Sequence, residues 1–214
     1  MKRFKYPDKI EIGIDEAGRG CMAGPVYAAA VIWPTDPELD SFMIKDSKKI
    51  SKKKREIIAP YIETHAVAFG VGSCSAEEID KHNILEATYM AMHRAVDNLL
   101  DTKKETNKDI LLVDGKWFKP YWNKEGTVIE HECIEKGDAH FTSIAAASIL
   151  AKVYHDRHIK KICTEFPQYS ELYQWGKNMC YGTAVHMNAI RENGITEFHR
   201  KTFGICARSK MLHI

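Results

Sequence analysis

The sequence predicts an α/β fold in one domain with a small appendage. Short apolar runs that suit strands alternate with longer segments whose apolar residues recur at helical spacing. With 214 residues, the chain is long enough to build one domain around a sizeable core. We find no internal repeat and no low-complexity linker that would divide it.

The first three strands are predicted near residues 11–14, 26–33 and 66–73. The run at 26–32 is apolar throughout, so the second strand should be largely buried. A basic helix from residue 51 to about residue 62 is predicted between the second and third strands. These elements give the beginning of a sheet with a helix packed on it.

A long helical region follows the third strand. Ser75-Ala76-Glu77-Glu78 matches a capping box and predicts the start of a short helix, and Asn83 is predicted to cap a longer one. Apolar residues then recur at helical spacing, and we expect this stripe to face the core. The stripe consists of Leu85, Tyr89, Met92, Val96 and Leu99.

The aliphatic run at 110–113 predicts a buried strand that ends at Asp114-Gly115. A loop rich in aromatic residues comes next, and another strand is predicted near 128–133. The aromatic residues of the loop are Trp117, Tyr121 and Trp122.

Residues 141–163 contain neither Gly nor Pro and are rich in Ala, which predicts one long helix. Its later part is charged, and we expect Asp156 to form an ion pair on the helix surface rather than to serve as a further acidic ligand. Helices are also predicted at 169–175 and at 183–193, the second ended by Gly194.

The most informative residues are Asp15 and Glu16, two adjacent carboxylates that end the first apolar run. Carboxylates this close repel each other unless a cation neutralises them. Because neighbouring strand residues point to opposite faces, one acid can face a cleft, and the other reaches a metal only near a strand end. By itself, the pair could also be a surface feature before a glycine turn.

Two more acids, Asp114 and Asp138, stand at the ends of predicted elements. Taken singly, Asp114 could be a turn residue, and Asp138 could be an acid that favours a helix start. Four carboxylates placed in this way suit hard divalent cations such as Mg2+ or Mn2+, which prefer oxygen ligands.

Composition and charge argue against a uniformly basic protein, a disulfide-linked secreted protein and a membrane-spanning protein. The net charge is +2, so any basic surface must be local, as in the cluster at 45–55. No Cys-x-x-Cys pair occurs among the six cysteines, so we expect reduced thiols and a cytoplasmic protein. No signal peptide is recognised, and no apolar stretch approaches the roughly 20 residues of a membrane span.

Eight short motifs follow one another along nearly the whole chain. They are DEAGRG at 15–20, AGPV at 23–26, DSKK at 46–49, LVDG at 112–115, KGD at 136–138, SIAAASILAKV at 143–153, YGT at 181–183 and HRKTF at 199–203. In their order and content, they resemble the type 2 ribonuclease H family, specifically bacterial-type ribonuclease HII.

The resemblance implies a ribonuclease H-like fold, with a five-stranded mixed sheet, helices on both faces and a small C-terminal helical lobe. It implies a catalytic core at 1–165 and a substrate-binding region at 166–214. The implied activity is hydrolysis of the RNA strand of RNA–DNA hybrids and nicking on the 5′ side of ribonucleotides in duplex DNA. The products carry a 3′ hydroxyl and a 5′ phosphate, and the process serves ribonucleotide removal and primer degradation.

The resemblance also implies roles for the four acids Asp15, Glu16, Asp114 and Asp138. They would hold two divalent cations, Mg2+ or Mn2+, of which one activates the attacking water and the other stabilises the leaving 3′ oxygen. Gly18, Arg19 and Gly20 match the family's ribonucleotide-sensing loop, where glycines let peptide groups approach a 2′-OH. Without the neighbouring acids, such a Gly-x-Gly would indicate only a turn.

Tyr181 matches the tyrosine that this family places against the sugar of the deoxynucleotide beside the ribonucleotide. By itself, it could be an ordinary loop aromatic. The family usually has Lys-Gly before this tyrosine, whereas this chain has Met179-Cys180, which removes a charge and a flexible residue. This departure therefore affects how the protein would recognise the junction between DNA and RNA.

Basic residues could track phosphates. Lys48 is the contact that the resemblance favours, whereas residues 52–55 could simply form a solvated helix face. His199 and Arg200 could either contact a nucleic-acid backbone or serve the structure. We expect RNA–DNA hybrids and ribonucleotide-containing duplex DNA as partners, no membrane, and a monomer. The alternatives are another nuclease of the same fold and a non-catalytic hybrid-binding protein.

Overall fold

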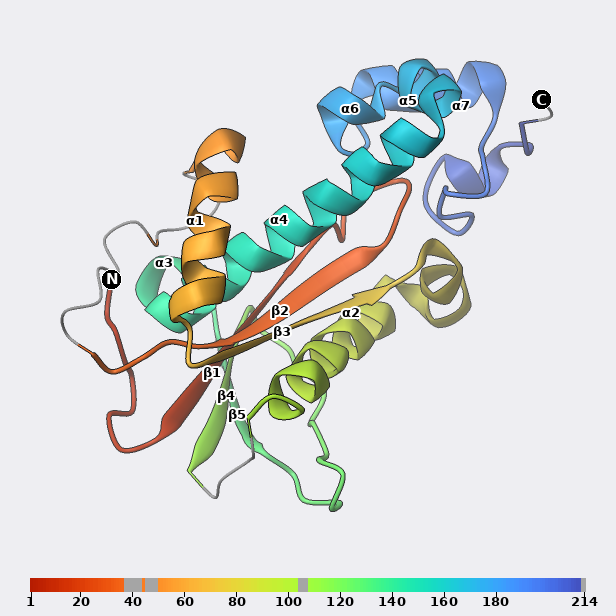
Figure 1. The fold of residues 1–214 in the computed structure, drawn as a ribbon. Coiled ribbons are helices and arrows are strands. Elements are labelled where there is room, and N and C mark those ends of the chain that lie inside the picture. The colour runs from red at the N-terminus through yellow and green to blue at the C-terminus, as the bar shows by residue number, and fades with distance from the viewer. Residues whose placement is uncertain (37–43, 45–49, 104–107, 213–214) are drawn as a thin grey trace.

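A five-stranded mixed sheet forms the centre of the molecule (Figure 1). The computed structural model describes residues 1–36, 44, 50–103 and 108–212. The strands are β1 (Ile10–Ala17), β2 (Val26–Ile32), β3 (Ala68–Cys74), β4 (Asp109–Asp114) and β5 (Glu130–Ile134). Their order is β3-β2-β1-β4-β5, antiparallel from β3 to β1 and parallel from β1 to β5. The predicted α/β class and the five-stranded mixed sheet are confirmed.

The parallel pairing of β1 with β4 decides where the site lies. Ile14 is opposite Val113 in this register, so Asp15 and Asp114 come next on their strands at the same sheet edge. Both carboxylates were predicted to end apolar runs, and the register now brings the two ends together.

Helices cover both faces of the sheet. On one face lie α1 (Lys52–His65) and α4 (Thr142–Glu165), and on the other lies α2 (Ala76–Leu100) (Figure 1). Gly13 permits a close approach to α4, because a Cβ at this position would lie 2.3 Å from the backbone carbon of Ser143 at the start of that helix. The sheet and α4 are therefore in direct backbone contact next to Asp15.

The long helix α2 begins at the predicted capping box and is kinked at Asn83, whose φ is 66°. The Asn83 side chain accepts hydrogen bonds from the backbone N–H groups of the next turn, as a helix cap does. The predicted core stripe is confirmed for Met92, Val96 and Leu99, and Tyr89 is partly buried. It is wrong for Leu85, which is 44% exposed, because this residue lies in the first turn after the kink and outside the packed face.

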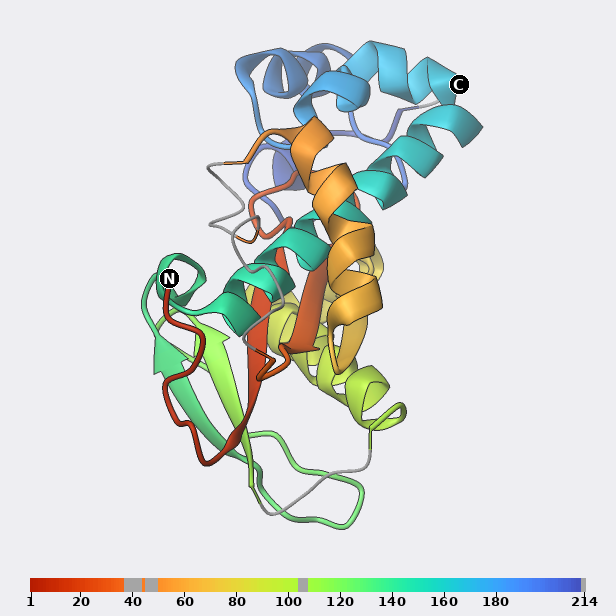
Figure 2. The ribbon, with the colours of Figure 1, turned by 60° about the vertical axis from the view of Figure 1, so that its left-hand side comes forward.

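The C-terminal residues form a helical lobe at the far end of α4 (Figures 1 and 2). It contains α5 (Pro167–Tyr173), α6 (Trp175–Asn178), α7 (Ala184–Asn193) and a 3-10 helix (Cys206–Arg208). Its apolar cluster includes Tyr173 and Trp175 and continues into Cys21 and Ala23, which follow β1. The lobe is therefore packed against the loop that leaves the acidic end of β1.

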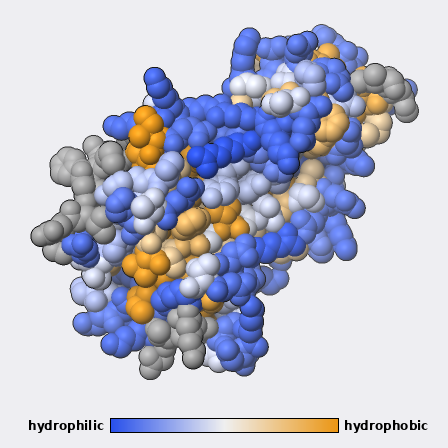
Figure 3. Space-filling model, viewed as in Figure 1, coloured by the Kyte–Doolittle hydropathy of each residue, from blue (hydrophilic) through white to orange (hydrophobic). Residues whose placement is uncertain are grey.

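The surface in Figure 3 is hydrophilic over the C-terminal lobe and α4, whereas hydrophobic residues gather over the middle of the sheet. No helix in the described ranges is long and apolar enough to cross a membrane. All six cysteines are free thiols, as predicted.

Candidate active site

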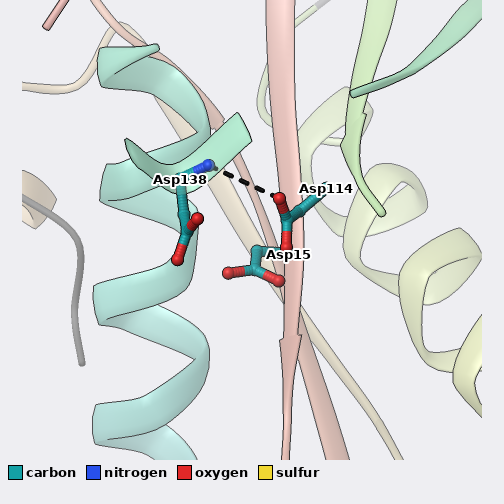
Figure 4. Close-up of side chains that lie close together, drawn as sticks. All are labelled: Asp15, Asp114 and Asp138. Atoms are coloured by element: carbon teal, nitrogen blue, oxygen red, sulfur yellow. Dashed lines mark hydrogen bonds between the residues drawn. The ribbon is translucent and has the colours of Figure 1, made fainter. Parts of the chain in front are cut away.

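Three carboxylates meet at the edge of the sheet where β1 and β4 end (Figure 4). They belong to Asp15 of β1, Asp114 at the end of β4 and Asp138 of the short helix α3 (Gly137–His140). One oxygen of each lies within 4.8 Å of the others, and Asp15 and Asp138 are only 5% and 3% exposed. In the described part of the chain, this is the one group of three or more side chains arranged to share a cation.

Backbone and side-chain donors orient the acids. The Oδ1 atom of Asp114 accepts from the N–H of Gly137 at 2.7 Å and from the N–H of Asp138 at 3.5 Å (Figure 4). The turn that delivers these donors begins at Lys136, which has a left-handed backbone with φ of 56°. Asp15 is held by a hydrogen bond with Ser148 of α4. The acids are therefore fixed by the sheet, by α3 and by α4.

The electrostatics of this group favour a bound cation. Burial raises the pKa of Asp15 well above its ordinary range, and the neighbouring charges of Glu16 and Asp114 raise it further. A divalent cation among the carboxylates would remove this repulsion and replace the lost hydration. The oxygen donors fit the preference of Mg2+ and Mn2+.

Glu16 lies outside the close group of three. Residues on the same side of β1 as Asp15 face α4, and strand alternation turns Glu16 to the other side. Its carboxylate accepts from Arg19 at 3.2 Å and still lines the same pocket as Asp15 and Asp114. The structure therefore brings three of the four predicted acids together and leaves Glu16 at the rim.

A pocket of about 270 Å³ opens beside the acids. It is lined by residues from β1, the following loop, β4, α1, α4 and the C-terminal lobe. Those outside the acids are Ala17, Gly18, Arg19, Gly20, Arg55, Ser148, Lys152 and Tyr181. The predicted loop and the predicted tyrosine thus share one cavity with the carboxylates.

The Gly18–Gly20 loop is built on a buried arginine. Arg200 has no exposed surface and donates to the carbonyl oxygens of Gly18 at 2.7 Å, Arg19 at 2.8 Å and Gly24 at 3.0 Å. A contact of Arg200 with a nucleic-acid backbone is therefore wrong, and the structural alternative is confirmed. Gly18 is needed for two reasons: its φ is +90°, and a Cβ there would lie 2.5 Å from the His155 ring.

Tyr181 faces this loop from the C-terminal lobe. It forms an isolated antiparallel bridge with Cys21, and a Cβ on Gly20 would lie 3.9 Å from its ring. Its carbonyl oxygen pairs with Nδ1 of His186 at 3.1 Å, and Nε2 of His186 lies 3.1 Å from Nε2 of His199. The backbone of Tyr181 is thus anchored to buried histidines. His199 has no exposed surface, so the structural alternative is confirmed for it and the contact with a nucleic-acid backbone is wrong, whereas the sequence did not single out His186.

Met179 and Cys180 precede Tyr181 in a left-handed backbone, with φ of 50° and 64°. This conformation favours glycine and costs another residue on the order of 1–2 kcal/mol. A hydrogen bond from the N–H of Cys180 to the Asn178 side chain, at 2.9 Å, helps to hold the turn. Cys180 therefore adopts a glycine-like conformation, and its side chain is buried.

Two predictions about charged residues are corrected by burial. Asp156 forms the predicted ion pair, with Lys152, but the pair is not on the helix surface. The Asp156 side chain is buried, with the residue only 3% exposed. The basic run at 52–55 is not one solvated face: Lys52 and Arg55 are partly buried, whereas Lys53 and Lys54 are exposed. Lys48 lies outside the described residues.

A family model for ribonuclease HII matches residues 12–206. The ribonuclease HII of Parabacteroides distasonis is 48% identical over 195 residues, which cover 91% of this chain and 90% of that protein. The ribonuclease HII of Christiangramia forsetii is 47% identical over 199 residues, covering 92% of each chain.

Solved structures have the same fold. Ribonuclease HII in a complex with PCNA from Archaeoglobus fulgidus is 25% identical, with a TM-score of 0.70 over 91% of this chain and 95% of that one. Bst-RNase HIII in complex with Mn2+ is 19% identical, with a TM-score of 0.70 over 94% of this chain and 69% of that one.

Proposed function

The chain belongs to the ribonuclease HII family of endoribonucleases, and from this premise we propose how it acts. It nicks duplex DNA on the 5′ side of an embedded ribonucleotide and cuts the RNA strand of RNA–DNA hybrids, leaving a 3′ hydroxyl and a 5′ phosphate. The observation that supports this most is the pocket in which the acids, the Gly18–Gly20 loop and Tyr181 come together.

In this proposal, Asp15, Asp114 and Asp138 hold divalent cations, Mg2+ or Mn2+, and Glu16 completes the set from the pocket rim. When bound, the cations supply an activated water and neutralise charge on the leaving oxygen. The chain itself contributes the fixed geometry. The amides at Gly137 and Asp138 orient Asp114, and the Ser148 side chain orients Asp15.

The Gly18–Gly20 loop and the C-terminal lobe recognise the ribonucleotide. Peptide groups of Gly18, Arg19 and Gly20 hydrogen-bond the 2′-OH, which distinguishes RNA from DNA. The ring of Tyr181 lies against the next sugar and requires that this sugar lack a 2′-OH. Lys48 contacts a phosphate. The core at 1–165 carries the acids, and residues 166–214 contribute substrate binding.

The working form is a monomer that acts in the cytoplasm on RNA–DNA hybrids and on duplex DNA with embedded ribonucleotides, in ribonucleotide removal and primer degradation. A cytoplasmic site of action agrees with six free thiols, which would be prone to oxidation in an oxidising compartment.

A strand-cleavage assay tests the proposal. The substrate is duplex DNA with one ribonucleotide, the control is the same duplex without it, and Mg2+, Mn2+ and EDTA are compared. We expect one nick 5′ to the ribonucleotide with either metal and none in EDTA. Equal cleavage of all-DNA duplex would indicate a different nuclease of this fold, and binding without cleavage would indicate a non-catalytic binding protein.

A further inference from the structure

Two cations line the pocket that no step proposed above employs. They are Arg55 of α1 and Lys152 of α4, whose side chains are only 12% and 20% exposed. They lie in the same cavity as the carboxylates of Asp15, Glu16 and Asp114. Partly buried cations in a cavity next to a phosphate-cleaving centre are candidates for binding another part of the same substrate.

One buried carboxylate holds both cations. Oδ1 of Asp156 lies 2.8 Å from Nζ of Lys152, and Oδ2 lies 3.8 Å from Nη2 of Arg55. A second contact fixes Arg55, whose Nη1 donates to the carbonyl oxygen of Ile50 at 2.6 Å. The two cations therefore come from different helices and converge on one point.

This ion cluster carries a net positive charge. Burial opposes the ionisation of Asp156, but hydrogen bonds from His155 and Lys152 hold its pKa below the ordinary value. Burial also lowers the pKa of His155, which keeps that ring neutral at physiological pH. One carboxylate thus faces two cations, an arrangement that can accept a further anion.

The position of Lys152 indicates which anion. Its Nζ lies 4.9 Å from the centroid of the Tyr181 ring. A sugar placed on that ring is flanked by backbone phosphates, and the cation at its edge is within reach of one of them. We propose that Arg55 and Lys152, positioned by Asp156, form a phosphate subsite for the backbone phosphate next to the sugar on Tyr181. This inference rests on the function proposed above and adds a subsite separate from the acids.

The competing explanation is that the cluster only fastens α1 to α4. Arg157 of α4 already does this from outside the pocket, where it pairs with Glu56 at 3.0 Å and with Glu63 at 3.8 Å. Arg157→Met is therefore a matched control for looser helix packing. Lys54→Met, on the exposed side of α1, is a matched control for lost charge.

The experiment compares steady-state cleavage of a single-ribonucleotide duplex in Mg2+ over a series of salt concentrations. Lys152→Met and Arg55→Met should each raise KM by about tenfold or more, as expected for loss of a charge-assisted hydrogen bond, with a smaller change in kcat. Each should reduce the slope of log(kcat/KM) against log[salt] by about 0.9, and the double variant should reduce it no further, because one phosphate is shared.

Two more variants separate positioning from general charge. Lys152→Arg keeps the cation and should retain a KM near that of the unaltered chain. Asp156→Asn makes the pocket more positive, yet it should raise KM because both cations lose their anchor, whereas a simple charge effect would lower KM.

The inference is overturned if Lys152→Met leaves the salt slope unchanged, or if Arg157→Met or Lys54→Met raises KM equally. It is also overturned if Lys152→Arg fails as Lys152→Met does while both remain folded in thermal melting. Failure of the proposed function looks different, because the unaltered chain would then show no metal-dependent cleavage.

Discussion

The buried histidine pair behind Tyr181 should make the stability of this protein depend on pH. Nδ1 of His199 accepts from the N–H of Thr196 at 2.9 Å, so the ring proton sits on Nε2, directed at Nε2 of His186. His186 then carries its proton on Nδ1 and donates to the carbonyl oxygen of Tyr181. Trp175 also donates to Nε2 of His186, at 3.2 Å. A second proton on either ring would point at a group that already donates a hydrogen to that ring nitrogen, so protonation of either histidine is disfavoured.

The magnitude follows from the pKa of His199, which burial and then the neighbouring His186 lower from 6.5 to about 3. Since the folded pKa is lowered, the unfolded chain binds more protons below pH 6.5, and stability is lost as the pH falls through that value. At pH 5, the unfolded residue is largely protonated and the folded one is not. Because pH 5 lies about 1.5 units below the unfolded pKa of 6.5, this residue alone lowers the free energy of unfolding by about 2 kcal/mol at pH 5.

The test is the free energy of unfolding in urea at pH 8 and at pH 5, for the unaltered chain and for His199→Gln. The glutamine amide can still donate to His186 but does not titrate. We expect the loss between the two pH values to be about 2 kcal/mol smaller in His199→Gln. His140→Gln, at an exposed position, serves as the matched control for a histidine-to-glutamine substitution outside the buried pair. An equal loss in His199→Gln and in the unaltered chain would refute the reasoning.

Three further predictions concern the site directly. Asp114→Asn should keep the fold and hybrid binding but reduce metal-dependent cleavage by roughly a thousandfold, which corresponds to about 4 kcal/mol in the barrier to cleavage. Full activity in this variant would show that Asp114 is not a metal ligand. Tyr181→Ala should impair nicking at a single ribonucleotide more than cleavage of a long hybrid, and equal impairment would argue against a junction role. Gly18→Ala should lower the melting temperature by several degrees because its Cβ would meet the His155 ring, whereas Gly20→Ala, with no contact below 3.9 Å, should change it little.

The sequence predicted best what depends on local pattern. The apolar runs that end at Asp15 and Asp114 predicted two buried strands, and the family order of the motifs placed them in the right fold. Parallel pairing of those strands then brings the carboxylates together, a consequence of sheet geometry that local pattern does not contain. The kink at Asn83 was also visible as a cap, but the exposure of Leu85 depended on how the helix packs.

Long-range polar pairing could not be predicted. Arg200 reaches carbonyl groups of residues 18, 19 and 24, which no local pattern in the sequence indicates. The partial burial of Lys52 and Arg55 is different, because the sequence does contain a pattern that indicates it. These residues precede the buried Ile58, Ala59 and Ile62 at helical spacing, so they share the face that packs inward.

The fold connects catalysis to recognition through a single rigid element, α4. Along one face of this helix, Ser148 contacts Asp15, Lys152 lies in the pocket over Tyr181, and Asp156 holds Lys152 from the next turn. Ile159, one turn farther, belongs to the apolar cluster of the C-terminal lobe. At about 1.5 Å per residue, Ser148 and Lys152 are about 6 Å apart along the axis, close to two nucleotide rises of about 3.4 Å on one strand. In the proposed function, the helix therefore holds the acids and Tyr181 at a fixed separation of close to two nucleotide rises along its axis. Under the proposed function, selection of the DNA–RNA junction follows from that fixed spacing.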